Sequence, residues 1–242
     1  ASNYANGAIT RTILSSLQDK SQYINNTLDN YINEIKNTLF VYSYNLGLTD
    51  FLTSDPKNET ERFIAFKNFN NSAQAIVAPK KYCKLFVIIP EKNYIFSTDK
   101  KSTMNTHTSE YIKEFISLFG EENIIGSLIT EKFVPPVVLS DKISFSVIQE
   151  LPYVSSNPII DDSKCYIIMT SSEQYFKDMF ENIENNGTSE FVLITNDQFE
   201  IIYSGIDFSK DEIPDIQNQL RKLNSISEPV FTISFKNEPY IG

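Results

Sequence analysis

The strongest constraint on the fold is residues 8–48, which contain no proline and a single glycine, Gly47, near their end. Apolar side chains recur there at spacings of three and four, which places them along one face of an α-helix. They are Ile13, Leu17, Ile24, Leu28, Tyr31, Ile32, Ile35, Leu39 and Tyr42. The pattern predicts one helix roughly 60 Å long. We expect it to end at Gly47 and to serve as a spine that carries smaller units.

The apolar stripe of this helix can serve two purposes. We expect its later part to pack against sheets. The first turns, residues 9–17, would pair with a second copy of the chain as a coiled coil. A homodimer through the N-terminal helix is therefore one expected partnership.

The composition of the 242-residue chain is that of a soluble globular protein, with 41% hydrophobic and 21% charged residues. The formal net charge is -10, and the 21 basic residues are scattered among 31 acidic ones. This argues against nucleic acid as a partner, because phosphate binding needs clustered Lys and Arg. No apolar run reaches the about 18 residues that a membrane-crossing helix requires. The chain starts inside a helical pattern, which indicates an excised piece of a longer protein.

The middle of the chain alternates helical and strand-like patterns. Asn58 followed by Glu61 predicts the start of a second helix that runs up to Pro79. We then expect a hairpin, a short helix, a loop that bears Gly120 and Gly126, and three strands. These elements are the hairpin at 84–90 and 94–98, the helix at 108–119, and strands at 132–139, 143–151 and 165–170. Pro135 and Pro136 make 132–139 an edge or bulged strand.

Two strands, a helix and three strands predict a five-stranded antiparallel sheet with helices on its faces, in an α+β fold. This arrangement belongs to the PAS-like domains. The same order then begins again. Ser171 and Gln174 predict a capping box for a helix over 172–183. A second unit follows, which is either cut inside or reduced: a hairpin at 191–195 and 199–203, a helix at 210–223 and a strand at 230–235.

This order of elements resembles the tandem (double) Cache sensor domains, which lie outside the bacterial membrane between two transmembrane helices. The stretch that carries the resemblance best is 143–180, with the strand end Glu150-Leu151-Pro152, the strand 166–169 and the helix start 172–176. The chain looks most like the ectodomains of Firmicute sensor histidine kinases and membrane-bound AraC-type regulators. It departs from amino-acid-binding members, whose signature includes Trp, because it contains no Trp.

The resemblance implies a division of the chain into four parts. They are the spine at 1–50, a membrane-distal PAS-like ligand-binding unit at 51–171, a connecting helix at 172–186 and an incomplete membrane-proximal unit at 187–242. It also implies flanking transmembrane helices beyond this sequence.

The two cysteines, Cys83 and Cys165, fit neither a zinc site nor a disulfide framework. They are either separate buried thiols or, if their strands are neighbours in an oxidising compartment, a single disulfide. The PAS-like arrangement makes the first and fifth strands central neighbours, which would bring Cys83 near Cys165.

Catalysis finds little support in the sequence. The only histidine, His107, lies in a polar segment without the nucleophile and orienting carboxylate that a general base needs. The acidic pairs Glu121-Glu122 and Asp161-Asp162 lack the alternating oxygen ligands of a calcium loop. No Gly-rich phosphate loop occurs. We expect no enzymatic activity, no cofactor and no metal.

A small-molecule pocket is the remaining candidate, between the sheet and helix 108–119. Such pockets combine apolar walls with a few polar groups. Residues alternate between the faces of a strand, so Ser144 and Ser146 share one face and Ile143, Phe145 and Val147 share the other. If the spine covers the Ile143 face, the two serines face the pocket. The predicted ligand-binding residues are then Tyr111, Phe115, Ser144, Ser146 and Tyr166.

The sequence therefore predicts a small-molecule-sensing domain on the extracytoplasmic face of the cell membrane. It would belong to a signal-transduction protein that controls transcription as a histidine kinase or an AraC-type regulator. The ligand domain of a methyl-accepting chemoreceptor and a secreted binding protein are the alternatives.

Overall fold

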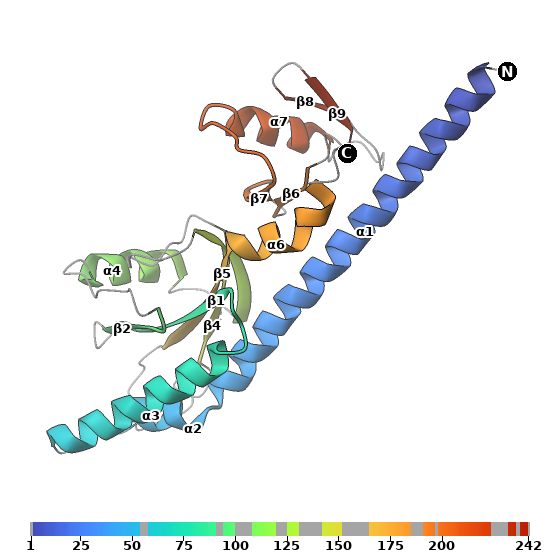
Figure 1. The fold of residues 1–242 in the computed structure, drawn as a ribbon. Helices are drawn as coiled ribbons and strands as arrows, with labels where there is room; N and C mark the ends of the chain where they lie inside the picture. The colour runs from blue at the N-terminus through green and yellow to red at the C-terminus, as the bar shows by residue number, and fades with distance from the viewer. Residues whose placement is uncertain are drawn as a thin grey trace.

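The computed structural model is an α+β fold with a long N-terminal helix and antiparallel sheets, which confirms this part of the prediction (Figure 1). It describes residues 2–53, 58–90, 94–99, 108–119, 125–130, 142–151, 165–184, 191–196, 198–223, 232–235 and 238–241. The helices are α1 (Ser2–Ser43), α2 (Leu46–Thr53), α3 (Glu59–Val77), α4 (Thr108–Phe119), α6 (Glu173–Glu184) and α7 (Ile213–Leu223). The strands are β1 (Cys83–Ile89), β2 (Tyr94–Ser97), β3 (Ile125–Thr130), β4 (Ile143–Glu150), β5 (Tyr166–Ser172), β6 (Leu193–Thr195), β7 (Ile201–Ser204), β8 (Thr232–Phe235) and β9 (Glu238–Ile241).

The spine is confirmed, but its predicted end at Gly47 is wrong. Helix α1 ends at Ser43, and α2 begins at Leu46. The Asn45 side chain accepts hydrogen bonds from the backbone N–H groups of Gly47, at 2.9 Å, and Leu48, at 3.3 Å. It thus caps a new helix instead of continuing the old one. Gly47 lies inside α2, where an added Cβ would come within 3.0 Å of Ser72 Oγ, so it permits close packing against α3.

The five strands β1 to β5 form one sheet in the order β2-β1-β5-β4-β3, and every neighbouring pair is antiparallel. The predicted pairing of the first and fifth strands is confirmed. The loop predicted around Gly126 is wrong, because β3 occupies Ile125–Thr130 and pairs with β4. Gly126 coincides with a register shift in this pair, and glycine tolerates such irregularities. The strand predicted at 132–139 lies outside the described residues.

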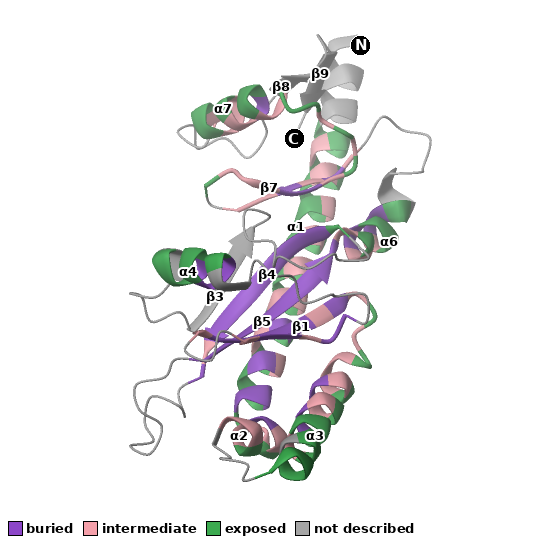
Figure 2. Ribbon diagram, turned by 90° about the vertical axis from the view of Figure 1, so that its left-hand side faces the viewer, coloured by how far each residue is buried: buried purple, intermediate pink, exposed green. Residues whose placement is uncertain are grey.

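The sheet is a buried layer between α1 on one face and α4 on the other (Figures 1 and 2). One apolar cluster joins α1 to the sheet, and a second joins α4 to the opposite face. The α1 side includes Ile35, Leu39, Leu85, Val87, Phe145, Val147, Ile167 and Met169. The α4 side is Phe86, Ile88, Ile95, Tyr111, Ile112, Phe115, Ile148, Tyr166 and Ile168. Alternation therefore assigns the residues of the regular strand segments to one face or the other.

Tyr31 connects α1 to the sheet through hydrogen bonds and ring contacts. Its hydroxyl group lies 2.9 Å from Ser171 Oγ on β5 and 3.3 Å from Cys83 Sγ on β1. Its ring stacks on Tyr175 of α6, with centroids 3.6 Å apart, and meets Phe145 of β4 edge-on. Burial, reinforced by Cys83, raises the pKa of Tyr31, so the phenol stays neutral. One side chain thus joins α1 to four elements that are distant in sequence: β1, β4, β5 and α6.

Helices α2 and α3 close the far end of the spine. The predicted cap of α3 is confirmed, because the Asn58 side chain accepts a hydrogen bond from the Glu61 backbone N–H at 2.9 Å. Phe51 of α2 stacks on Phe69 of α3 at 4.6 Å between ring centroids, and Phe69 meets Phe96 of β2 at 4.5 Å. Aromatic packing therefore anchors this helical corner to the edge of the sheet.

The C-terminal part does not form a second five-stranded sheet among the described residues. It contains two separate two-stranded sheets, β6 with β7 and β8 with β9, together with α7. Phe176 and Phe180 of α6 pack against Tyr203 of β7, at centroid distances of 5.3 and 5.7 Å. The predicted capping box at Ser171 is wrong by one residue. Ser172 Oγ accepts from the Gln174 backbone N–H at 3.1 Å, while Ser171 bonds to Tyr31.

The neighbouring strands do not bring the two cysteines together. Because β1 and β5 are antiparallel, Cys83 lies opposite Ser171, whereas Cys165 lies beyond the Ile88–Tyr166 pair at the other end. Six residues of strand separate the two ends, roughly 20 Å. Both thiols are buried and free, so the expectation that they lie near each other is wrong.

Both thiols should react individually in the unfolded protein. Alkylation in denaturant without reductant should add two labels, detected by intact mass, because the native fold holds the sulfur atoms too far apart for a disulfide. An unlabelled protein would contradict the antiparallel register of β1 and β5.

Replacing Tyr31→Phe should lower the free energy of unfolding by about 1–2 kcal/mol, because the buried Ser171 hydroxyl loses its partner while the ring stack remains. Urea unfolding measures the change. The control is Tyr23→Phe on the same helix, where the side chain is 60% exposed and the change should stay within about 0.5 kcal/mol. Equal effects of the two substitutions would contradict the role given to Tyr31.

Candidate functional site

Polar side chains gather on the α4 face of the sheet, where its two central strands meet. Ser146 and Glu150 alternate with Phe145 and Val147, which face α1, so both polar residues lie on the α4 side. Tyr166 is part of the apolar cluster on that side and lies directly opposite Glu150 in the register. Two strands thus place a carboxylate and two hydroxyl groups on the same face of the sheet.

Four polar atoms in this region are buried without a hydrogen-bond partner among the described residues: Ser144 Oγ, Ser146 Oγ, Glu150 Oε2 and Tyr166 OH. The side chains of Ser144, Ser146 and Tyr166 are 0%, 1% and 1% exposed. An unsatisfied buried polar group costs about 1–3 kcal/mol, and folded proteins contain few of them. A concentration of such groups on adjoining strands is typical of a site that receives hydrogen bonds from another molecule.

Helix α4 supplies an apolar wall opposite these groups. Tyr111, Ile112 and Phe115 are buried against the sheet, in the same cluster as Ile148 and Ile168. The Phe115 ring meets the Tyr166 ring edge-on, with centroids 4.8 Å apart. Together, apolar walls and a few inward polar groups are the usual make-up of a small-molecule site.

The phenol of Tyr166 remains neutral at physiological pH. Burial, followed by the charges of Glu150 and Cys165, raises the pKa of Tyr166 to about 12. A neutral phenol can both donate and accept a hydrogen bond. On the facing helix, burial and then the charge of Glu114 raise the pKa of Tyr111. The site therefore offers hydroxyl groups that can serve as donors or as acceptors.

The structure brings four of the five predicted site residues together. Tyr111, Phe115, Ser146 and Tyr166 all lie between α4 and the sheet. Ser144 is buried next to them, but it lies at a register shift between Ile143 and Phe145, where regular alternation is interrupted.

Sequence reasoning missed Glu150 as a site residue. It was taken only as the end of a strand. Glu150 lies four residues after Ser146 on the same strand, and residues an even number of positions apart lie on the same face, so the sequence could have placed the two side chains together.

The structure gives no basis for a metal at this site. Among the described residues, no group of three or more His, Cys, Asp or Glu side chains is close enough to hold an ion. His107 and the acidic pairs Glu121-Glu122 and Asp161-Asp162 lie outside the described residues.

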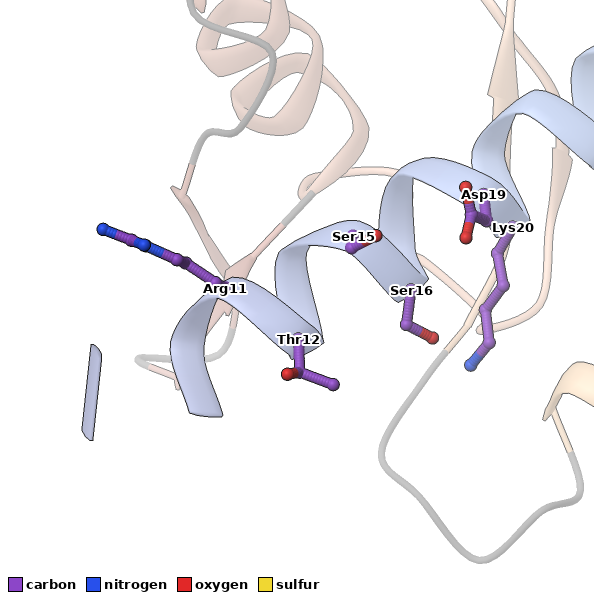
Figure 3. A pocket seen from close by; sticks show the side chains of 6 residues that line it. All are labelled: Arg11, Thr12, Ser15, Ser16, Asp19 and Lys20. Atoms are coloured by element: carbon purple, nitrogen blue, oxygen red, sulfur yellow. The ribbon is translucent and has the colours of Figure 1, made fainter. Parts of the chain in front are cut away.

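A hollow of about 530 Å³ lies against the N-terminal half of α1 (Figure 3). Its described lining comes from a single helix: Arg11, Thr12, Ser15, Ser16, Asp19 and Lys20. Figure 3 shows these side chains spread along successive turns rather than directed at one point. The hollow lacks the converging groups found between α4 and the sheet.

No protein-family model matches this sequence, and no curated protein matches it. Among the helices that the structure describes, none combines the length and apolar character needed to cross a membrane. The geometry of the site, together with the sequence pattern, is therefore what indicates a function.

Two buried serines on opposite faces of the sheet should respond in opposite ways to substitution. Ser146→Ala removes an unpartnered hydroxyl and should leave stability unchanged or raise it by up to about 1 kcal/mol. Ser171→Ala removes a partner of Tyr31 and should cost about 1–2 kcal/mol. Urea unfolding without ligand measures both. A clear loss of stability in Ser146→Ala would show that this hydroxyl already has a partner in the folded chain.

Proposed function

We propose that this chain is the extracytoplasmic small-molecule-sensing domain, of the double Cache type, of a bacterial transmembrane signal-transduction protein. The full-length protein would control transcription as a histidine kinase or an AraC-type regulator, with transmembrane helices flanking this segment. In this proposal the chain has no enzymatic activity. It binds a ligand, changes conformation and transmits that change to the flanking transmembrane helices.

The arrangement of the central sheet supports the PAS-like part of this proposal. Two strands, a helix and three strands follow one another, and strands one and five are neighbours within an antiparallel sheet of five. The C-terminal part supports only a reduced second unit, since its described strands form two hairpins around α7.

The observation that carries the proposal is the set of unpartnered polar atoms between α4 and the sheet. A ligand that supplies the missing hydrogen bonds to Ser146, Glu150 and Tyr166 would stabilise the folded protein. Only the folded chain holds these three side chains on one face of the sheet, so ligand binding would favour the conformation that presents them together.

A route for the signal leads from this site to both ends of the chain. Tyr166 at the site and Ser171 at the Tyr31 joint belong to the same strand, β5. The strand continues directly into α6, whose Phe176 and Phe180 pack on β7. A small shift of β5 would therefore reach α1 through Tyr31 and the C-terminal unit through α6.

The proposal includes a homodimer through the first turns of α1. Packing of α1 on the core begins at Ile24. Ile13, about three helical turns further towards the N-terminus, is 51% exposed. An apolar stripe that continues beyond the domain supports pairing with a second helix of the same kind.

A thermal-shift screen against sugars, organic acids, amino acids, amines and short peptides tests the proposed function. We expect one chemical class to raise the melting temperature in a dose-dependent manner. Ser144→Leu and Ser146→Leu should abolish that rise while the protein remains folded, because the larger side chains would block access of a ligand to the polar groups beneath α4.

The matched control is Ser15→Leu on the exposed face of α1, beside the hollow of Figure 3. It should bind the same ligand as the unsubstituted protein. Ligand binding that survives the changes at Ser144 and Ser146 but is lost in Ser15→Leu would move the site to α1 and reject the proposed placement.

A further inference from the structure

A line of exposed side chains runs along α1 at alternating spacings of four and three residues. Its members, the outer line, are Thr12, Ser16, Asp19, Tyr23, Asn26, Asn30, Asn33, Asn37, Phe40 and Tyr44, the last directly after the helix. All ten are exposed. Spacings of four and three repeat every seven residues, which is the repeat of the contact positions in a coiled coil of two helices.

The outer line lies on the side of α1 opposite to the sheet. The α1 residues that pack on the core are Ile24, Leu28, Tyr31, Ile32, Ile35, Leu39 and Tyr42. At 3.6 residues per turn, their mean direction differs from that of the outer line by roughly 170° around the helix axis. Figure 1 shows the sheet, α4 and α6 on one side of α1. The helix can therefore pack on its own sheet and on a second helix at the same time.

The composition of the outer line is unusual for a helix surface that meets only water. Between Tyr23 and Tyr44 it contains no charged side chain, and four of its positions are asparagine. Asparagine is a poorer helix former than Lys, Glu or Gln, so helix propensity does not explain a row of four. At the contact positions of a coiled coil, asparagine is a residue that specifies the register of the two helices.

Aromatic rings lie at both ends of this uncharged stretch. Tyr23 is 60% exposed, Phe40 53% and Tyr44 56%, and the Phe40 and Tyr44 rings meet with centroids 5.3 Å apart. Because an aromatic side chain offers about 150–250 Å² of surface, the three rings leave roughly 300 Å² exposed per copy. Two copies would bury roughly 600 Å² through these rings alone, a large share of the about 1,200–2,000 Å² of a stable interface. The asparagines and Val41, which is 64% exposed beside the line, add to this area.

The charged residues beside the outer line accept a second copy in parallel orientation. Heptad geometry then places Asp29 of one copy near Glu34 of the other. Glu34 already forms an ion pair with Lys80 of its own chain, which offsets the repulsion. Lys36 comes next to Val41 of the second copy, where the aliphatic part of the lysine can cover the valine.

We infer that α1 pairs with a second copy of the chain along the outer line, parallel and in register, through the tyrosine, asparagine and phenylalanine side chains of residues 23–44. This inference rests on the proposed function, because two copies anchored in one membrane run in the same direction. It extends the pairing beyond the first turns, where Ile13 follows Thr12 and flanks the same line. Identical residues then face each other, and paired asparagine amides can both donate and accept.

Two neighbouring asparagines provide matched probes of this arrangement. Asn26 belongs to the outer line, whereas Asn25 is equally exposed but points roughly 100° away from it. Oxidation of Asn26→Cys by copper phenanthroline in air should give a disulfide-linked dimer on non-reducing electrophoresis, because the two thiols meet across parallel helices. Asn25→Cys should link at least about tenfold more slowly. The unsubstituted chain, whose two cysteines are buried, should stay unlinked.

Sedimentation equilibrium measures the dissociation constant of the dimer. With asparagine at four contact positions, we expect a weak, reversible dimer, on the order of 100 μM. Phe40→Glu puts like charges opposite each other and should weaken it at least about tenfold. The matched control is Phe63→Glu on α3, where the ring is 65% exposed and lies off the line, and the constant should change by less than about twofold. Melting temperatures show that both variants remain folded.

Four results would overturn the inference. They are a chain that stays monomeric up to about 1 mM, equal linking of Asn25→Cys and Asn26→Cys, a dimer that Phe40→Glu does not weaken, and linking that appears only when Asn26→Cys is mixed with Asn37→Cys. The last result would mean antiparallel helices.

The ligand screen decides the sensing role separately from these measurements. A ligand found in that screen, together with any of the four results, would leave the sensing role in place and reject the outer line as an interface. Linking of Ile13→Cys without linking of Asn26→Cys would likewise reject it and confine pairing to the first turns. Linking at Asn26 with a screen that finds no ligand would support the interface and count against the sensing role.

Discussion

The hydrogen-bonded joint at Tyr31 is the contact on which the arrangement of the whole chain depends. A long helix touches a sheet along a narrow apolar stripe, and apolar contact alone tolerates sliding along such a stripe. Hydrogen bonds are directional, so the pair of contacts from the Tyr31 hydroxyl to Ser171 and Cys83 fixes the helix in register with the sheet. The ring stack on Tyr175 extends this fixed point to α6. The contacts of Tyr31 thereby fix the positions of α1, the central sheet and α6 relative to one another.

Strand β5 links this joint to the candidate site through the alternation of its side chains. Ile167, Met169 and Ser171 face the spine, whereas Tyr166 and Ile168 face α4. Tyr166 of the candidate site is therefore bonded directly to Ile167, which faces the spine. Interiors are close-packed, so a displacement on one face of the strand is transmitted to the other. The proposed coupling would need no chain of intermediate residues, because the two faces belong to the same strand.

Features decided by short-range sequence were predictable, and those decided by distant partners were not. The Asn58 cap, the β1–β2 hairpin and helix α4 follow from neighbouring residues, and all three are confirmed. The break at Asn45 was missed because the apolar stripe continues through it, and only the side-chain cap shows that a new helix begins. Ser171 and Ser172 are both capable of capping α6, and the choice between them depends on Tyr31, 140 positions away. The distance between the cysteines follows from strand direction. Each cysteine lies at the start of its strand, and antiparallel neighbours have their starts at opposite ends, so the predicted antiparallel sheet already implied that the two thiols are far apart; the expectation that they are close considered neighbour order alone.

In the candidate site, too, the sequence pattern predicts which face a residue lies on but not which residues it bonds to. Alternation correctly places Ser146 on the α4 side, but alternation says nothing about whether a buried serine has a partner. Ser171 and Ser146 are alike in sequence character and burial, yet one is bonded to the spine and the other is not. At about 1–3 kcal/mol each, the unsatisfied groups cost a large part of the roughly 5–15 kcal/mol by which domains are stable. In the proposed sensing role, a ligand would supply the missing hydrogen bonds and recover part of this cost. The free energy recovered on binding would then be available to shift the conformation of β5.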